Sequence, residues 1–326
     1  KKMGIKFLNK YLIKKCSKRS IRRVNLSDLK NKVFVIDTSI YLYKFLGENA
    51  LIENMYLFLS KMHHNNIKPI FIFDGKPPDE KKELLRQRRL EKKEAESKYD
   101  GIKQQIIDAS YQNITIENRK ELLDEMEELR QKFIRVKDGD IKKVKELFDA
   151  FGVSYINSPT EADHLCSYLS QGENVYCVSD DMDMFIYGCK NIVRNIDLQD
   201  DSLLLYSYEN ILSDLNMTDK ELKEILILSG TDYNIDLNTS LSETLKWFSS
   251  YKKEIAKKEV CIDFYDWLIK NTKYVEDLDK LNKLYAYFSK EYLLAFDSNI
   301  EVPKQKEKNE MKIQEIMREE GFVFLK

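Results

Sequence analysis

The chain has 326 residues, of which 43% are apolar and 33% are charged. This length is enough for one large domain or two of the usual size, with a substantial buried core. Only 10 Gly and 5 Pro are present, which excludes collagen-like and proline-rich disordered chains and indicates a helix-rich globular protein. No apolar run approaches the roughly 20 residues of a membrane span and no secretory leader is recognisable, so we expect an intracellular protein that is not secreted and does not associate with membranes.

Strand patterns and helix patterns alternate along the chain. The strand patterns are short apolar runs rich in β-branched and aromatic residues, which is typical of strands buried on both faces. They cover residues 32–37, 69–74, 153–156 and 174–179, and helical patterns cover 40–61 and 141–151. This order predicts an α/β fold with a mostly parallel, twisted central sheet and helices on both of its faces.

Seven acidic residues lie at the predicted strand ends or at the starts of predicted helices. Ligand sites of such sheets gather at the carboxyl ends of the strands, although a single acid there also caps helices and turns. Two pairs are closely spaced, one in the first turn of a helix that follows Pro159 and one in the loop that follows the fourth strand. The seven are Asp37, Asp74, Glu161, Asp163, Asp181, Asp183 and Asp232.

This set of acids predicts a site for divalent cations. Carboxylates about 4 Å apart repel by several kcal/mol in a partly dry site, so such a cluster persists only when it is protonated or holds cations. The five cysteines include no C-x-x-C pair and there are only three histidines, so the ligands would be oxygens. All-oxygen ligation favours Mg²⁺ or Mn²⁺, and two such ions are a standard arrangement for phosphodiester hydrolysis.

The charge distribution predicts a polyanionic partner. The net charge of the chain is only -1, but residues 1–32 hold twelve Lys or Arg and the single acid Asp28. A second basic stretch at 81–98 lies in a charged helical segment that separates Asp74 from Glu161 and is too long for a simple crossover. We expect it to project from the sheet with Lys81, Leu85 and Arg88 on one helix face, near the acids. A solvated helix face, or a coiled-coil or partner-binding projection, is the alternative interpretation.

Six motifs, in order, resemble those of the flap endonuclease (XPG-type) superfamily of structure-specific 5′ nucleases. Each of the seven acids falls in one of the motifs, and the similarity covers about residues 3–245. The motifs are MGIKFL at residues 3–8, VIDTS at 35–39, FDGKPP at 73–78, SPTEAD at 158–163, DDMD at 180–183 and LSGTDY at 228–233.

The resemblance implies a role for each matching residue. It assigns Asp37, Asp74 and Asp163 to one Mg²⁺, with Asp163 also bridging towards a second ion that Asp181 and Asp183 hold. Glu161 and Asp232 would act on the ions through water. Lys81 and Arg88 would touch the scissile phosphate and stabilise charge in the transition state. The DNA contacts that the resemblance implies are Tyr43, which would stack on the terminal base, Gly4, which would lie against the substrate, and Lys76, which would contact a phosphate.

The chain also departs from the family pattern. Asp163 stands where many members have Glu, and its shorter carboxylate alters the spacing open to a metal. Residues 234–244 contain no glycine, so the expected helix-turn-helix at about 222–250 is degenerate, which argues against close duplex contact and a K⁺ ion there. Residues 314–326 show no clear sliding-clamp box. We predict a nuclease core at 1–245, with a helical arch at about 79–137, and a helical extension at 246–326.

The function predicted from the sequence is a divalent-metal-dependent 5′ flap endonuclease with 5′ exonuclease activity in DNA replication or repair. Its substrate would be branched or flapped duplex DNA, cut by a monomer in the nucleus or another DNA-containing compartment. Within the superfamily, the alternative is a nuclease that resolves junctions or bubbles; a ribonuclease with a related acidic site is more distant. The third alternative is a catalytically inactive DNA-binding scaffold, and the presence of all seven acids argues against it.

Overall fold

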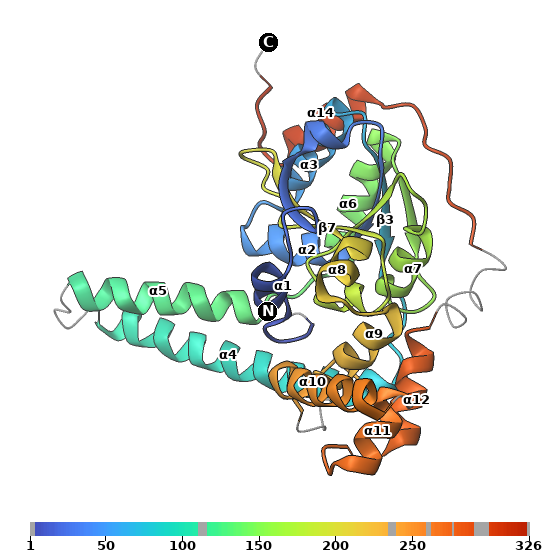
Figure 1. Cartoon of the computed structure of the whole chain (residues 1–326). Helices are drawn as coiled ribbons and strands as arrows, with labels where there is room; N and C mark the ends of the chain where they lie inside the picture. The colour runs from blue at the N-terminus through green and yellow to red at the C-terminus, as the bar shows by residue number, and fades with distance from the viewer. Residues whose placement is uncertain are drawn as a thin grey trace.

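A seven-stranded mixed sheet forms the centre of the protein (Figure 1). The computed structural model describes residues 4–109, 116–233, 239–258, 262–275, 277–289 and 300–324. The strands are β1 (Ile21–Asn25), β2 (Val33–Asp37), β3 (Lys68–Phe73), β4 (Ser154–Asn157), β5 (Val175–Val178), β6 (Asn191–Arg194) and β7 (Ser202–Ser207).

The strand order is β1-β7-β6-β5-β2-β3-β4. Strands β4, β3, β2, β5 and β6 are parallel, whereas β7 is antiparallel to both β6 and β1. The prediction of an α/β fold with a mostly parallel sheet is therefore confirmed. The sequence patterns anticipated β2 to β5 and missed the three strands on the other side of the sheet.

Helices cover both faces of the sheet because successive side chains of each strand point to opposite sides. In β2, Phe34 and Ile36 enter one apolar core and Val35 enters the other. The helices of the first core are α2 (Thr38–Gly47), α3 (Leu51–His64), α6 (Asp138–Phe151) and α14 (Glu310–Glu319). The second core includes α1 (Leu8–Lys15), α7 (Ala162–Leu169), α8 (Tyr208–Leu215) and α9 (Asp219–Leu228).

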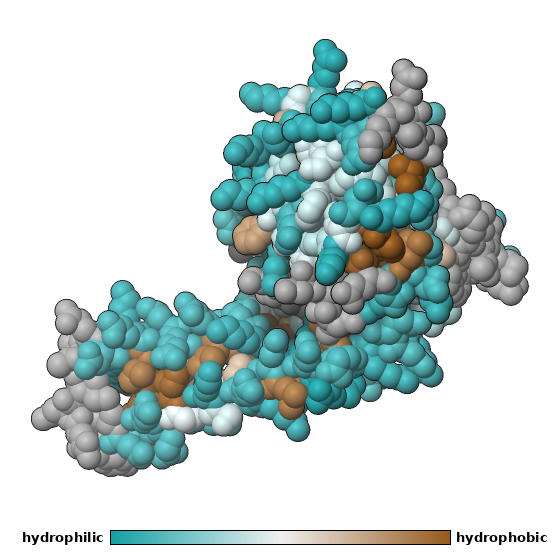
Figure 2. All heavy atoms as spheres, turned by 60° about the horizontal axis from the view of Figure 1, so that its bottom comes forward, coloured by the Kyte–Doolittle hydropathy of each residue, from teal (hydrophilic) through white to brown (hydrophobic). Residues whose placement is uncertain are grey.

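A two-helix arch projects from the carboxyl end of the sheet (Figure 1). It consists of the short 3₁₀ helix η2 (Asp79–Lys81), then α4 (Lys82–Ala109) and α5 (Ile116–Lys132). A small apolar cluster that includes Ala95, Ile102 and Leu129 joins the two helices. Figure 2 shows apolar side chains along the arch among hydrophilic ones. The exposed apolar residues of α4 and α5 are Leu90, Ile107 and Leu123.

The base of the arch is attached to the turn between α2 and α3. The helical pattern at 40–61 is divided there, because Asn49 has the left-handed backbone angle φ 55°. Arg130 of α5 donates to the side-chain oxygen of Asn49 at 2.6 Å and to the carbonyl oxygen of Gly47 at 2.8 Å. These contacts set the position of α5 relative to the sheet.

The carboxyl-terminal part of the chain packs in two places. Helices α10 (Leu241–Lys258), α11 (Phe264–Asn271) and α12 (Leu278–Tyr287) gather around α9, and α10 runs across residue 245, the predicted end of the core. Residues 300–309 then return to the sheet, where Lys306 donates its backbone N–H to Gly152 at 2.8 Å. In the described part of the chain, no helix is both long enough and apolar enough to cross a membrane.

Candidate active site

Two of the predicted acids follow neighbouring parallel strands. Asp37 ends β2 and accepts a hydrogen bond from the backbone N–H of Ser39 at 3.2 Å, so it also caps α2. Asp74 follows β3 and accepts from the Ser39 hydroxyl at 2.5 Å. Its other oxygen accepts from the backbone N–H of Ala162 at 2.9 Å. One serine thus bonds to both acids, and Asp74 is joined to the start of α7.

Glu161 and Asp163 begin α7, as the position of Pro159 predicts. Gly75 brings this helix start close to Asp74, because its backbone N–H donates to Thr160 at 2.6 Å. A Cβ atom at Gly75 would lie 2.9 Å from the carbonyl oxygen of Pro159, which is closer than real side chains come. Only glycine fits this approach. Gly75 lies in the FDGKPP motif, but no role for it was predicted.

The third group of acids, Asp181 and Asp183, follows β5 and lies beside Gly4. Asp181 follows β5, and one of its oxygens accepts the backbone N–H of Asp183 at 2.9 Å. Gly4 has φ +64°, and a Cβ there would lie within 3 Å of an oxygen of both acids. The predicted contact of Gly4 with substrate remains a prediction, but its place against this pair leaves no room for a side chain.

Two arch cations pair with the acids. Lys81 is only 7% exposed, and its Nζ donates to Glu161 Oε1 at 2.6 Å and lies 3.8 Å from Asp232 Oδ2. Arg88 donates from Nη2 to the same oxygen of Asp232 at 2.9 Å. The structure therefore brings Lys81 of η2 and Arg88 of α4 to two of the acids.

The acids act on one another electrostatically. Burial, followed by the charges of Asp37 and Asp181, raises the pKa of Asp163 well above its usual range. Burial, followed by Asp181 and Asp232, does the same to the pKa of Asp183. Burial lowers the pKa of Lys81, but the charges of the surrounding acids have a larger opposite effect, so the pKa of Lys81 is raised. Such strongly perturbed groups are typical of functional sites.

The chemistry of these side chains fits a hard divalent cation. The donors are carboxylate oxygens, and one buried oxygen of Asp183, Oδ1, has no hydrogen-bond partner among the described residues. In their present positions, no three acidic, His or Cys side chains within the described ranges form a group that could hold one ion. Two of the seven acids, Glu161 and Asp232, are instead paired with Lys81 and Arg88.

The predicted DNA contacts lie in different surroundings. Tyr43 lies on α2, and burial followed by the charge of Asp74 raises its pKa. The Nζ of Lys92 lies 5.2 Å from the centre of its ring. Lys76 is exposed in the loop between β3 and η2. Residues 234–238, in the predicted glycine-free hairpin, lie outside the described residues.

Two tyrosines at the site were not assigned a role from the sequence. Tyr233 donates a short hydrogen bond to Glu161 Oε2. Tyr287, at the end of α12, lies with its hydroxyl 2.9 Å from that of Tyr233. Tyr233 directly follows Asp232 in the LSGTDY motif, so its place near the site could have been predicted from the sequence. Nothing in the local sequence around Tyr287 points to the site.

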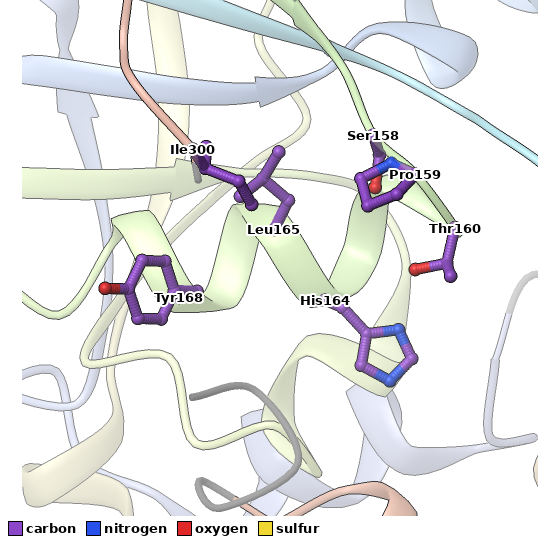
Figure 3. Close-up of a pocket in the computed structure, with 7 residues that line it drawn as sticks. All are labelled: Ser158, Pro159, Thr160, His164, Leu165, Tyr168 and Ile300. Carbon is purple, nitrogen blue, oxygen red and sulfur yellow. The ribbon is translucent and has the colours of Figure 1, made fainter. Parts of the chain in front are cut away.

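A small cavity lies beside α7 (Figure 3). His164, Leu165 and Tyr168 of α7 line it together with the loop at 158–160 and Ile300. Its volume of about 10 Å³ has room for about one water molecule. It is too small for a nucleotide, so the surface formed by the acids and arch cations remains the candidate site.

Known proteins resemble this chain in sequence and in fold. The sequence matches the XPG N-terminal domain over residues 3–95 and the XPG I-region over residues 152–232. Flap endonuclease 1 of Methanococcus aeolicus is 28% identical over 276 residues, which are 74% of this chain and 80% of the relative. Flap endonuclease 1 of Lodderomyces elongisporus is 29% identical over 251 residues, 71% of this chain, which spans only 61% of that relative.

The fold is shared with a solved structure. The catalytic core of Rad2 in complex with DNA substrate superimposes with a TM-score of 0.64 at 22% identity, covering 97% of this chain and 95% of that one. The two matched XPG regions together span more than half of the 326 residues and contain all seven predicted acids. The chain therefore belongs to the flap endonuclease and XPG superfamily of structure-specific 5′ nucleases.

Proposed function

We propose that this protein is a divalent-metal-dependent 5′ flap endonuclease with 5′ exonuclease activity that hydrolyses DNA phosphodiesters. The observation that carries the proposal is the meeting of arch cations and sheet acids at one place, seen in the pairs of Lys81 with Glu161 and Arg88 with Asp232. A surface that combines metal-binding oxygens with phosphate-binding cations suits a phosphodiester, whose negative charge grows in the transition state.

Seven acids would hold two Mg²⁺ ions, for which Mn²⁺ would substitute. Asp37, Asp74 and Asp163 would serve one ion and Asp181 and Asp183 the other, with Glu161 and Asp232 acting through water. Bound there, the ions would supply Lewis-acid activation of water and of the phosphate. The unpartnered oxygen of buried Asp183 supports this assignment, because a buried carboxylate oxygen otherwise has a hydrogen-bond donor.

Lys81 and Arg88 would exchange their carboxylate partners for the scissile phosphate when DNA enters. Both reach the site from the first turns of the arch, so they lie on the path of a strand that passes between arch and sheet. Tyr43, on α2, would stack on the terminal base and offset the cost of unpairing it by about 1 to 3 kcal/mol. Gly4 and Lys76 would contact the backbone of the substrate.

DNA is the proposed substrate class, as it is for the Rad2 core whose fold this chain shares. We propose that the protein acts as a monomer in replication or repair, in a DNA-containing compartment. The direct test incubates it with a labelled 5′ flap, a bubble, a four-way junction and single-stranded RNA, each with Mg²⁺ or with EDTA. We expect metal-dependent cleavage of the flap near its base and little cleavage of RNA.

Asp181→Asn separates catalysis from binding. It should abolish flap cleavage and leave flap binding within a few-fold of the wild type. Asp180→Asn is the matched control, because the Asp180 carboxylate bonds to the backbone N–H of Asn195 at 2.7 Å and an amide oxygen can replace it. Preferred cleavage of the bubble or junction would favour the alternative nuclease, and EDTA-insensitive or absent cleavage would contradict the metal-dependent proposal.

A further inference from the structure

A pair of tyrosines connects the carboxyl-terminal helices to the candidate metal site. Tyr287 is the last residue of α12, and its hydroxyl is 2.9 Å from the hydroxyl of Tyr233. Tyr233 in turn donates to Glu161 Oε2, while Lys81 donates to Glu161 Oε1 at 2.6 Å. Both oxygens of Glu161 are thus held by protein donors.

The direction of the hydrogen bonds follows from the number of protons. A tyrosine hydroxyl has one proton, and that of Tyr233 points to the carboxylate. The contact between the two hydroxyls therefore requires Tyr287 to donate to the oxygen of Tyr233. A donor at this oxygen polarises the Tyr233 hydroxyl and strengthens its bond to Glu161. The direct distance from Tyr287 to Glu161 Oε2 is 3.5 Å, so the shorter route runs through Tyr233.

Ring packing holds the two hydroxyls in place. The ring centres of Tyr233 and Tyr287 are 4.7 Å apart, and Phe288 lies edge-on to Tyr233 at 5.3 Å. The Nζ of Lys81 lies 4.7 Å from the centre of the Tyr233 ring. The same tyrosine thus contacts Glu161 through its hydroxyl and Lys81 through its ring, so its position affects both members of that ion pair.

We infer that Tyr287 is a positioning residue of the nuclease site, acting through Tyr233 to fix the Glu161 carboxylate. The chain of hydrogen bonds from Tyr287 through Tyr233 to Glu161 is called the relay below. By this inference the carboxyl-terminal helices complete the acidic site as well as covering the core, because α12 supplies the first donor of the relay. The inference rests on the proposed function only in taking Glu161 to belong to the metal site. Groups that orient metal-site carboxylates in this way change metal affinity by 10- to 100-fold when they are removed.

Metal affinity of the DNA-free protein tests the relay independently of cleavage. We would titrate wild-type protein, Tyr287→Phe, Tyr233→Phe and the double variant with Mn²⁺, and read bound Mn²⁺ by calorimetry and electron paramagnetic resonance. We expect Tyr287→Phe to weaken Mn²⁺ binding about 10-fold and Tyr233→Phe to weaken it more. The double variant should equal Tyr233→Phe, because a relay has no effect once its last member is lost.

Tyr285→Phe is the matched control, since it removes a hydroxyl from the same helix. The charge of Tyr285 raises the pKa values of Tyr208, Lys220 and Tyr265, and we expect its variant to bind Mn²⁺ like the wild type. Wild-type affinity of Tyr287→Phe, or additive losses in the double variant, would overturn the relay while leaving the proposed function intact. A wild-type protein that binds no Mn²⁺ would overturn the proposed function and the relay with it.

Discussion

Replacing Lys81 with methionine removes the central cation of an acidic cluster and should destabilise the metal-free protein. The Lys81 side chain is 9% exposed, and its Nζ lies 2.6 Å from Glu161 and 3.8 Å from Asp232. Methionine keeps most of the side-chain volume without the charge. The loss of stability therefore measures how far Lys81 offsets the repulsion among the acids.

The structure sets the size of this effect. At an effective dielectric constant of about 20, charges about 4 Å apart attract by about 4 kcal/mol, which applies to the Asp232 contact. The variant can limit its loss by protonating a carboxylate. For an ordinary carboxyl group this costs about 4 kcal/mol at pH 7.5 and about 2 kcal/mol at pH 5.5. We expect the free energy of unfolding to fall by about 3 to 4 kcal/mol at pH 7.5 and by about 1 to 2 kcal/mol at pH 5.5.

Urea unfolding in EDTA at the two pH values measures the difference, and excess Mg²⁺ should reduce it because a bound cation replaces the lost charge. The matched control is Lys82→Met. Lys82 is the next residue, and its side chain is 72% exposed in a surface pair with Asp79, which contributes little. If the two variants were equally stable in EDTA at pH 7.5, Lys81 would not offset the charge of the acids.

Three further predictions concern the arch, a buried acid and the carboxyl-terminal helix. Arg88→Ala should lower the single-turnover cleavage rate about 100-fold while changing DNA affinity much less. The control, Arg89→Ala at an exposed position of the same helix, should change neither. An unchanged cleavage rate in Arg88→Ala would show that Arg88 takes no part in catalysis. Burial raises the pKa of Glu224 to about 7 from 4.5, so its charge costs stability as pH rises through this window. In thermal melts, the free energy of unfolding of Glu224→Gln should exceed that of the wild type by about 3 kcal/mol at pH 8.5 and equal it at pH 4.5. A difference in the free energy of unfolding that did not depend on pH would contradict this. Met317 of α14 is fully buried and Met311 of the same helix is 83% exposed. Met317→Ala should therefore lower the free energy of unfolding by about 2 to 5 kcal/mol, and Met311→Ala should hardly change it. Equal losses in urea unfolding would mean that α14 does not pack on the core.

The fold was predictable where a strand is buried on both faces. Continuous apolar runs at β2, β3 and β5 mark the centre of the sheet, because both sides of each strand are covered. β1 lies at the edge and exposes Arg22 and Arg23, so its apolar residues are too few to mark a strand. β7 has an apolar run from Leu203 to Tyr206 that is typical of a strand, so this strand was predictable from the sequence as well.

The acids of the candidate site could be proposed from the sequence because strand ends and family motifs indicated the same residues. Their partners were less so. Gly75 matters because one backbone segment approaches another, and that approach exists only in three dimensions. Tyr287 reaches Tyr233 because α12 packs beside α9, and it lies 126 residues from Glu161 in the sequence. No local pattern records such a contact.

The pairing of β1 with β7 delays completion of the sheet during synthesis. Ile21 lies opposite Tyr206, so the amino-terminal strand must wait for roughly 180 residues to be translated. At about 5 to 20 residues per second, this interval lasts about 10 to 40 s. Throughout it the nascent chain carries an unpaired, strongly basic segment that can attract RNA or ribosomal surfaces by charge alone.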